Sequence, residues 1–478
     1  MTSENLPGAK LDNSGNTKLP PKLDLFTMFR LGFYQMGLGV MSVLTLGVLN
    51  RVMINELKIP ATIVAGTLAL HQFMAPARVW FGQMSDAKPL LGKHRTGYMW
   101  LGAILFTFTA FLAVQVMWQL GNSLQVNGWT NPTYIWIGIL GIVFIFYGLV
   151  LSASSTPFAA LLVDISDEDN RSKVVGIVWS MLMVGIIIGA ITSSILLKQV
   201  DVGAPLETVQ ASVNNLFIIV PAVVLFLVFI STVGVEEKYS RYTSRSSIAN
   251  RENSVTLRKA LKVLTASRQT GLFFTFLLVL TISLFMQDAV LEPYGGEIFA
   301  MPISETTRLN AVSGTGTLIG LGTTGFFVVP RLGKKNSLKV GCIATAISFI
   351  LIVMSGFTAD PILFKGALFL YGLAAGLTTT AALSLMLDLT AAETAGTFIG
   401  AWGLAQAMAR GLSTVIGGAT LDLGRLLFNV SMLAYGLVFG LAAVGMFVAI
   451  FLLNRVNVRE FQDNAQQAIA TILEGELD

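Results

Sequence analysis

Residues 271–296 read GLFFTFLLVLTISLFMQDAVLEPYGG, an apolar run that ends in an amide and two carboxylates. About 20 consecutive apolar residues are enough for a helix to cross a lipid bilayer. Asp288 and Glu292 stand four residues apart, so a continuous helix would carry both on one face. Because a carboxylate in hydrocarbon is costly, such residues mark function more often than chance. We therefore predict a membrane-spanning helix with a polar site near its end; the alternative is a solvated pair at the membrane rim.

The rest of the chain repeats this pattern. Of its 478 residues, 54% are hydrophobic and only 12% are charged, whereas soluble domains average about 25% charged residues. Repeated apolar runs of this length indicate an all-α polytopic membrane protein. Hydropathy predicts twelve transmembrane helices, at roughly 28–50, 61–82, 97–118, 134–158, 174–197, 214–234, 271–291, 308–330, 338–357, 362–386, 397–419 and 431–453.

Charge and polarity divide these spans into two groups of six. Most Lys and Arg residues lie in segments on the same side as both termini, which predicts that both termini are cytoplasmic. Leu257, Leu261 and Leu264 recur at helical spacing in the polar segment between the groups, which indicates an amphipathic helix on the membrane surface. The predicted organisation is a disordered tail (1–25), an N-terminal six-helix bundle (26–234), a cytoplasmic linker (235–270), a C-terminal six-helix bundle (271–454) and a cytoplasmic amphipathic tail (455–478).

An internal repeat supports the two halves. Asp164 lies just beyond the fourth predicted span, at its inner end, and Gly176 follows twelve residues later. Asp388 lies just beyond the tenth predicted span, also at its inner end, and Gly400 follows at the same interval. The matching positions in the two groups favour a duplicated six-helix unit.

The loop after the second span combines acidic, glycine and basic residues. Asp86 comes four residues after Gly82, and Gly92 precedes the basic cluster Lys93-His94-Arg95. This pattern resembles the loop between spans two and three of the major facilitator superfamily. The resemblance implies that superfamily's fold of two six-helix bundles, and an acid that steadies one conformation where the halves meet. The residues assigned to such conformational loops are Gly82, Asp86, Gly92, Arg95, Asp164, Arg171 and Asp388; the alternative is that the loop only fixes topology.

Several polar side chains lie inside predicted spans. His71, Gln72 and Arg78 are in the second span, and Gln406 and Arg410 are in the eleventh. An arginine keeps its charge in proteins, so each one must face protein, water or a bound anion. His71 is either a ligand for a metal or a histidine hydrogen-bonded to a neighbouring helix. In the superfamily fold, spans two and eleven pack together across the two halves, so Arg78 and Arg410 are expected on one surface.

Signals for enzymatic chemistry are missing from the sequence. It contains no nucleotide-binding P-loop, zinc-protease helix or nucleophile elbow. Cys342 is the one cysteine and there are two histidines, so a cysteine-based metal site is excluded. The basic residues sit beside membrane spans, which argues against nucleic acid as a partner. We predict that the protein is not an enzyme.

Five segments together resemble one branch of that superfamily: 29–32, 50–53, 82–95, 164–171 and 287–295. With them the chain is similar to the PucC/LhaA-like, or bacteriochlorophyll delivery, family, and in its details to members from oxygenic phototrophs. The resemblance implies a role in placing chlorophyll-type pigment into light-harvesting or photosystem apoproteins during their assembly. It also implies a thylakoid or photosynthetic cytoplasmic membrane, with membrane lipid, pigment and small antenna-type proteins as partners.

A chlorophyll or bacteriochlorophyll ligand would need an apolar groove and an axial ligand for its magnesium, which His71, Gln72, Gln287 or Gln406 could supply. The candidate residues for binding pigment or another substrate are His71, Gln72, Arg78, Gln287, Asp288, Glu292, Gln406 and Arg410. Two other functions stay open. One is a proton-coupled transporter of a small solute, with Asp288 and Glu292 titrating in turn. The other is an assembly scaffold that binds no ligand.

Overall fold

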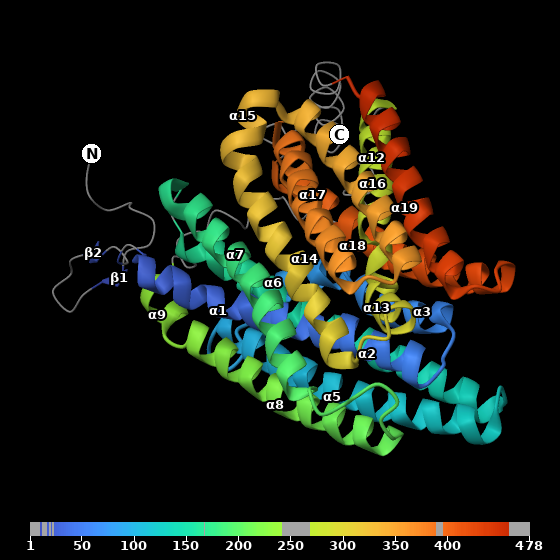
Figure 1. The fold of residues 1–478 in the computed structure, drawn as a ribbon. Coiled ribbons are helices and arrows are strands. Elements are labelled where there is room, and N and C mark those ends of the chain that lie inside the picture. Colours follow the sequence, from blue (N-terminus) through green and yellow to red (C-terminus); the bar gives the residue numbers. More distant parts are fainter. Residues whose placement is uncertain are drawn as a thin grey trace.

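The computed structural model describes residues 10–11, 17–18, 21, 23–166, 168–240, 268–388 and 395–457. Most of the predicted N-terminal tail, the amphipathic helix of the predicted linker and most of the C-terminal tail lie outside these residues. Two short strands, β1 (Lys10–Leu11) and β2 (Thr17–Lys18), pair antiparallel near the start of the chain. The rest of the described chain is built from helices (Figure 1).

The N-terminal bundle contains the first six crossings. Its first crossing is long because two π-helical segments, η1 and η2, continue α1 and α2 without a break in direction. Its elements are α1 (Leu25–Ser42), η1 (Val43–Val48), α2 (Leu49–Arg51), η2 (Val52–Glu56), α3 (Ala61–Phe73), α4 (Ala77–Ala87), α5 (Thr96–Asn127), α6 (Asn131–Ile165), α7 (Glu168–Leu196), α8 (Leu206–Thr232) and α9 (Val235–Tyr239).

The C-terminal bundle contains the other six. A 3₁₀ turn, η3, interrupts its first crossing, and a π-helical segment, η4, continues its second. Its elements are α12 (Arg268–Phe285), η3 (Met286–Ala289), α13 (Leu291–Ile298), α14 (Ile303–Thr323), η4 (Thr324–Val328), α15 (Val329–Leu332), α16 (Lys334–Thr358), α17 (Pro361–Asp388), α18 (Ala395–Leu427) and α19 (Ser431–Arg455).

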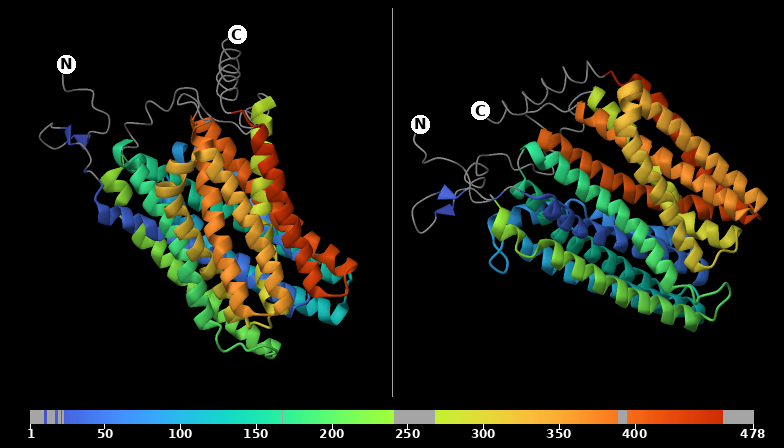
Figure 2. Two further views of the ribbon diagram at one scale, coloured as in Figure 1. Left: turned by 45° about the horizontal axis from the view of Figure 1, so that its top comes forward. Right: turned by 60° about the vertical axis from the view of Figure 1, so that its left-hand side comes forward.

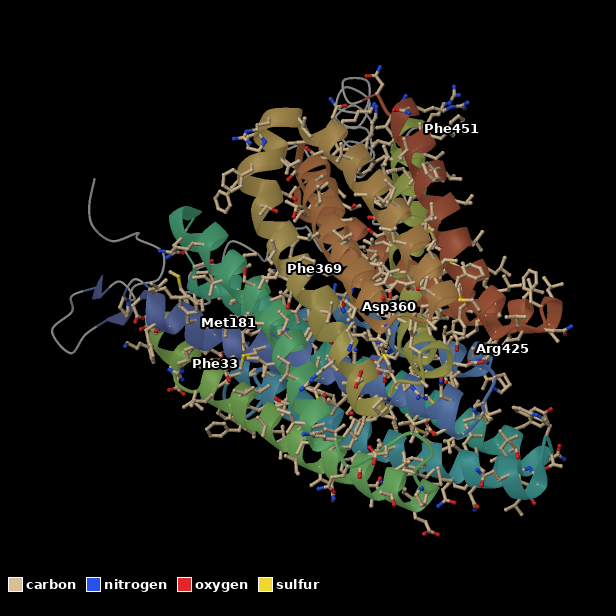
Figure 3. All side chains as sticks on the ribbon, in the orientation of Figure 1. Phe33, Met181, Asp360, Phe369, Arg425 and Phe451 are labelled. Carbon is tan, nitrogen blue, oxygen red and sulfur yellow. The ribbon has the colours of Figure 1, made fainter. Side chains whose placement is uncertain are left out.

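The predicted fold class is confirmed. Within the described residues, ten helices are long and apolar enough to cross a membrane. The two remaining crossings are α3 with α4, which the turn at Met74–Pro76 divides, and α18, which carries charged residues such as Arg410 and Asp422. Large apolar side chains such as Phe451, which is 54% exposed, project from the outer faces (Figure 3), as a lipid-facing surface requires.

The two bundles are packed together at one end and diverge at the other (Figures 1 and 2). We call the end with Asp24, Arg268 and Asn457 the termini side and the opposite end, with Glu56 and Asp360, the far side. The surface between the bundles is called the seam. Toward the far side, α3 packs along α18, and α2 and η2 pack on α13. Toward the termini side, the described parts of α4 and α15 pack extensively only within their own bundles.

Close helix packing inside each bundle depends on glycines, as at the contact between α14 and α17. A Cβ on Gly372 would overlap the backbone of Ser313, whereas Gly366, six residues earlier on α17, has open space at that position. Membrane helices commonly use small residues to approach this closely. A side chain at position 372 would therefore force the backbones of α14 and α17 apart.

Gly372→Ala is expected to lower the free energy of unfolding by about 1–3 kcal/mol, since overpacking outweighs the gain in helix propensity. Denaturant titration of the purified protein in mild detergent measures this change. The matched control Gly366→Ala should be neutral or slightly stabilising. Equal effects of the two substitutions would contradict the close contact.

Candidate functional site

The helix that carries Asp288 and Glu292 is broken between them. Residues Met286–Ala289 form a 3₁₀ turn, Val290 has a non-helical backbone (φ −124°), and α13 begins at Leu291. The prediction that one helical face carries both carboxylates is therefore wrong. A break inside a membrane span persists only where the freed backbone groups find partners. Asn50 of the opposite bundle supplies one, because its Nδ2 donates a hydrogen bond to the Ala289 carbonyl at 2.8 Å.

Glu292 lies buried at the seam. Its side chain is 3% exposed, and the Asn310 amide of α14 donates a hydrogen bond to Oε1. Oε2 has no partner within the described residues. Gly47 in the π-helical segment η1 packs so closely on this carboxylate that a Cβ would overlap it; such segments are frequent at functional sites.

The alternative of a solvated pair at the membrane rim is wrong for Glu292, which is buried, whereas Asp288 is exposed. Two polar residues beside Glu292 are buried as well. Asn50 is 1% exposed and Arg51 is 5% exposed. Arg51 pairs with Glu56 at 3.0 Å, and its charge also acts on Glu292. A cavity of about 190 Å³ lies beside Arg51, between residues of both bundles that include Asn55 and Glu297. These polar groups therefore belong to the packed contact between the bundles.

Hydrogen bonds between the bundles close the far side. Asn55 Nδ2 donates to the Pro293 carbonyl at 3.2 Å. The carboxylate of Asp422 on α18 accepts from the backbone N–H groups of Ala61 and Thr62 at 3.1 and 2.7 Å. Those N–H groups begin α3 and lack an intrahelical acceptor. Asp422 thus caps a helix of the other bundle.

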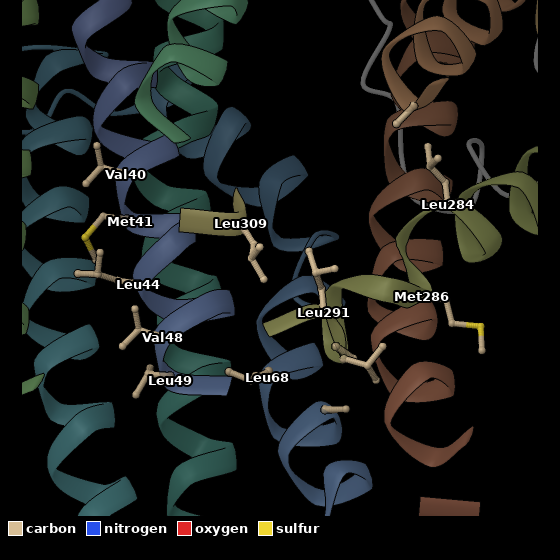
Figure 4. Close-up of a cluster of buried hydrophobic side chains, with 14 of the residues drawn as sticks. Val40, Met41, Leu44, Val48, Leu49, Leu68, Leu284, Met286, Leu291 and Leu309 are labelled. Carbon is tan, nitrogen blue, oxygen red and sulfur yellow. The ribbon is translucent and has the colours of Figure 1, made fainter. Parts of the chain in front are cut away.

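Apolar side chains fill the space around these bonds. Leu68 of α3, Leu291 of α13 and Leu309 of α14 belong to one cluster of buried apolar side chains, part of which is drawn in Figure 4. All three are fully or almost fully buried. The far-side contact is therefore a packed core with a few hydrogen bonds in it.

Three charged residues, Asp288, Arg78 and Arg410, interact electrostatically across the seam. Asp288, Arg78 and Arg410 are exposed although they stand in the middle of their crossings. The charges of Asp288 and Arg78 both act on Arg410. The guanidinium of Arg410 also lies over the Phe285 ring, 3.9 Å from its centre. The predicted meeting of Arg78 and Arg410 across the two halves agrees with this arrangement.

His71 and Gln72 end α3 just before the break at Met74–Pro76. His71 Nδ1 hydrogen-bonds to the Leu68 carbonyl of its own helix, and its ring lies edge-on to Tyr147 of α6, with 5.9 Å between ring centres. With the proton on Nδ1, the Nε2 lone pair is available. Gln72 Oε1 is buried and has no partner within the described residues.

The two other glutamines have different surroundings. Gln287 is 5% exposed; its amide donates to Asp288, and its Oε1 has no partner in the described chain. Gln406 lies on the side of α18 that faces Leu277 and Thr281 of α12. The structure thus brings Gln287 to the exposed charges and leaves Gln406 against a helix of its own bundle.

A separate charge network occupies the termini side of the N-terminal bundle. Arg95 contacts the carboxylate of Asp164 at 2.8 Å and that of Asp86, and it donates to Ser85. Burial lowers the pKa of Arg95, but Asp164 and Asp86 more than compensate and raise it above its usual range. The described partners in this network all belong to the N-terminal bundle.

Glu236 joins this network from α9. Its carboxylate accepts hydrogen bonds from the backbone N–H groups of His94, Arg95 and Thr96 at 2.8, 3.1 and 2.6 Å. These groups begin α5, so a carboxylate here also suits the positive end of the helix. The segment after the sixth crossing is thereby tied to the loop after the second.

Gly92 shapes the loop between α4 and α5. Leu90 and Lys93 exchange two backbone hydrogen bonds around Leu91 and Gly92, which have φ values of 53° and 74°. A two-residue turn of this kind needs positive φ at both central positions, which glycine adopts without strain. Gly82 is in α4, where a Cβ would make an ordinary contact with Thr156.

Arg171 and Asp388 are the two remaining residues of the predicted conformational loops. Arg171 is in α7 and Asp388 is the last residue of α17, but their side chains lie outside the described part of the chain.

Sequence reasoning missed Asp422, Asn310 and Asn55. Asp422 had one indirect signal, because Pro60 precedes α3 and cannot cap it with a side chain, so water or a side chain from elsewhere has to satisfy the first N–H groups of this helix. Asn310 and Asn55 are single amides in their helices, and no periodicity identifies their partners.

The chain is similar in sequence to several known proteins. A family model described as PUCC protein matches residues 48–461. Protein PucC of Rhodobacter capsulatus is 30% identical over 408 residues, which cover 84% of this chain and 85% of that protein. The protein named Bacteriochlorophyll synthase 44.5 kDa chain, also from Rhodobacter capsulatus, is 29% identical over 430 residues, covering 88% and 93%.

Solved structures of transporters share the fold. A crystal structure of a mutant of the nucleoside transporter NupG has a TM-score of 0.66 at 16% identity, covering 90% of this chain and 99% of that chain. A bacterial homologue of the iron transporter ferroportin, in an inward-facing state, has a TM-score of 0.63 at 12% identity, covering 91% and 99%. At these identities the likeness shows the fold alone, which is that of the major facilitator superfamily.

Proposed function

Because the chain belongs to the PUCC protein family, we propose that it handles chlorophyll-type pigment in a photosynthetic membrane. The protein binds, delivers or transports pigment while light-harvesting or photosystem apoproteins are assembled. It does not change the pigment chemically, although one relative is named as a synthase chain. The membrane is a thylakoid or photosynthetic cytoplasmic membrane with both termini in the cytoplasm, and the linker at 235–270 joins the two bundles there.

The open part of the seam is the observation that supports this function most. Asp288, Arg78 and Arg410 are exposed there, between helices whose other side chains are largely apolar. A chlorophyll-type molecule is a large apolar ring with polar groups at its edge and a central magnesium. A site with a few polar groups in an apolar wall suits such a molecule.

Several side chains near the seam fit the magnesium. His71 has an available Nε2, and the Oε1 atoms of Gln72 and Gln287 are buried without a partner in the described chain. Nitrogen and oxygen donors of this kind are suitable axial ligands. Glu292 would remain part of the contact around the site, and Gln406 is the weakest candidate because it faces α12. The loop residues around Asp86 and Arg95 would control conformation.

The main alternative function is proton-coupled transport of a small solute. The burial of Glu292 at the seam favours it. This carboxylate is buried at the seam with one oxygen unpartnered in the described chain. That function predicts uptake into vesicles driven by a pH gradient and lost in Asp288→Asn. A ligand-free scaffold predicts that partner binding persists when His71, Gln287 and Arg410 are all replaced.

The proposed function predicts what accompanies the full-length protein when it is purified from a membrane that makes pigment. We expect chlorophyll-type absorbance, a small antenna-type protein, or both, because pigment and apoprotein meet at this protein. Visible spectroscopy and mass spectrometry of the purified sample measure the two. Purification of an unrelated transporter from the same membrane is the control, and absence of both pigment and antenna-type protein contradicts the function.

A further inference from the structure

Arg78 and Arg410, which are exposed in the open part of the seam, differ from the buried or half-buried arginines of this chain. Arg51, Arg95 and Arg425 each contact a carboxylate, at 3.0, 2.8 and 2.7 Å. Within the described residues, neither Arg78 nor Arg410 has a hydrogen bond or ion pair for its guanidinium. The two are close enough for their charges to repel, and Asp288 attracts Arg410.

The charges in the open part of the seam do not balance. Two guanidinium groups face one carboxylate, and arginine does not lose its charge in proteins. His71 and Tyr371 are further titratable groups that act on these charges. A proton on His71 would only add positive charge, and a tyrosine hydroxyl is neutral near pH 7. One further negative charge would complete the site.

The surroundings hold Arg410 in place. Its guanidinium stacks over Phe285 at 3.9 Å, and the ring of Phe73, one residue before the break in the second crossing, packs against the adjacent Gly411. Arg78 follows the same break, and its charge acts on Arg410 across the seam. Stacking covers one face of a guanidinium and leaves its N–H edge free to bind a planar acceptor.

We propose that Arg78 and Arg410 together bind a carboxylate of the cargo. This inference rests on the function proposed above. It means that the preferred pigment carries a free carboxylate side chain that has not been esterified with a long-chain alcohol. Asp288 competes with that carboxylate for Arg410. The unpartnered Oε1 of the buried Gln287, next to Asp288, accepts a donor from the same cargo or its bound water.

Equilibrium binding to the purified full-length protein in detergent tests this inference, with chlorophyllide a as the free acid and chlorophyll a as its long-chain ester. Quenching of pigment fluorescence measures the two dissociation constants. The free acid should bind about 10- to 100-fold tighter, the range expected for hydrogen bonds to a charged group. Arg78→Gln and Arg410→Gln should each remove most of that preference while affinity for the ester stays unchanged.

Asp288→Asn should tighten binding of the free acid severalfold, because it removes the competing carboxylate. A gain in affinity cannot come from a misfolded variant. Arg425→Gln is the matched control, since Arg425 is paired with Glu297 on the far side, and it should change neither constant. Equal affinities for acid and ester in the wild type, or equal weakening of both in the arginine variants, would overturn the inference and leave pigment binding intact. If neither pigment binds, the proposed function fails with it.

Discussion

Arg95→Met is expected to lower the free energy of unfolding by about 3–5 kcal/mol, the largest loss of stability among the changes considered. Arg95 is 4% exposed and contacts Asp164, whose side chain is itself buried, at 2.8 Å. Removing the Arg95 guanidinium leaves the buried Asp164 carboxylate poorly solvated and without that cation. The loss of free energy is far larger than an exposed ion pair contributes. Denaturant titration of the purified protein in detergent measures the loss.

Lys93→Met is the matched control on the same loop. Lys93 pairs with Glu237 at 2.9 Å, but the Glu237 side chain is 63% exposed. An exposed pair of this kind contributes about 0–1 kcal/mol. Similar losses for Arg95→Met and Lys93→Met would contradict the buried network, and with it the view that this loop organises the termini side of the N-terminal bundle.

Asp422→Ala is expected to open the far side. Its carboxylate accepts two backbone hydrogen bonds from the start of α3, at 3.1 and 2.7 Å. Hydrogen bonds to a charged group contribute about 1.5–3 kcal/mol, so their loss shifts the balance between closed and open far sides by about 10- to 100-fold. Maleimide labelling of Ala289→Cys, a position buried at the seam, should accelerate accordingly.

Asp360→Ala separates this effect from the loss of a helix cap. Asp360 accepts a backbone hydrogen bond from Ile362 at 2.8 Å, at the start of α17 and within a single bundle. It should leave the labelling rate nearly unchanged. Equal acceleration in both variants would show that Asp422 only stabilises a helix and does not join the bundles.

The helical membrane fold could be predicted from the sequence because apolar runs repeat over the whole chain. The superfamily and the family were predicted from a resemblance of particular segments, above all 82–95 and 287–295. The break at Met286–Val290 was not predicted. Asn50 of the opposite bundle donates a hydrogen bond to one of its carbonyl groups, that of Ala289, and local periodicity contains no information about such a partner. The break in the second crossing was also missed, although Pro76 is a helix-breaking signal.

The candidate site was predicted in its composition more than in its geometry. Arg78, Arg410, Gln287 and Asp288 were identified because charge and amide groups are rare in apolar runs. Glu292 was assigned to the same face as Asp288, whereas it is buried with Asn310. Tertiary contacts decide that difference. The roles of these residues in binding, the domain boundaries and the origin in an oxygenic phototroph stay predictions.

In our proposal the pigment binds in one seam, which is open on the termini side and closed on the far side. Labelling of the Asp288→Cys variant tests this arrangement most directly. Cys342 is the one native cysteine and is fully buried, so a membrane-impermeant maleimide should report on the introduced thiol. In sealed vesicles we expect labelling from the termini side only, and slower labelling when chlorophyllide a is bound. Labelling from the far side, or a rate that saturating pigment does not change, would contradict this arrangement.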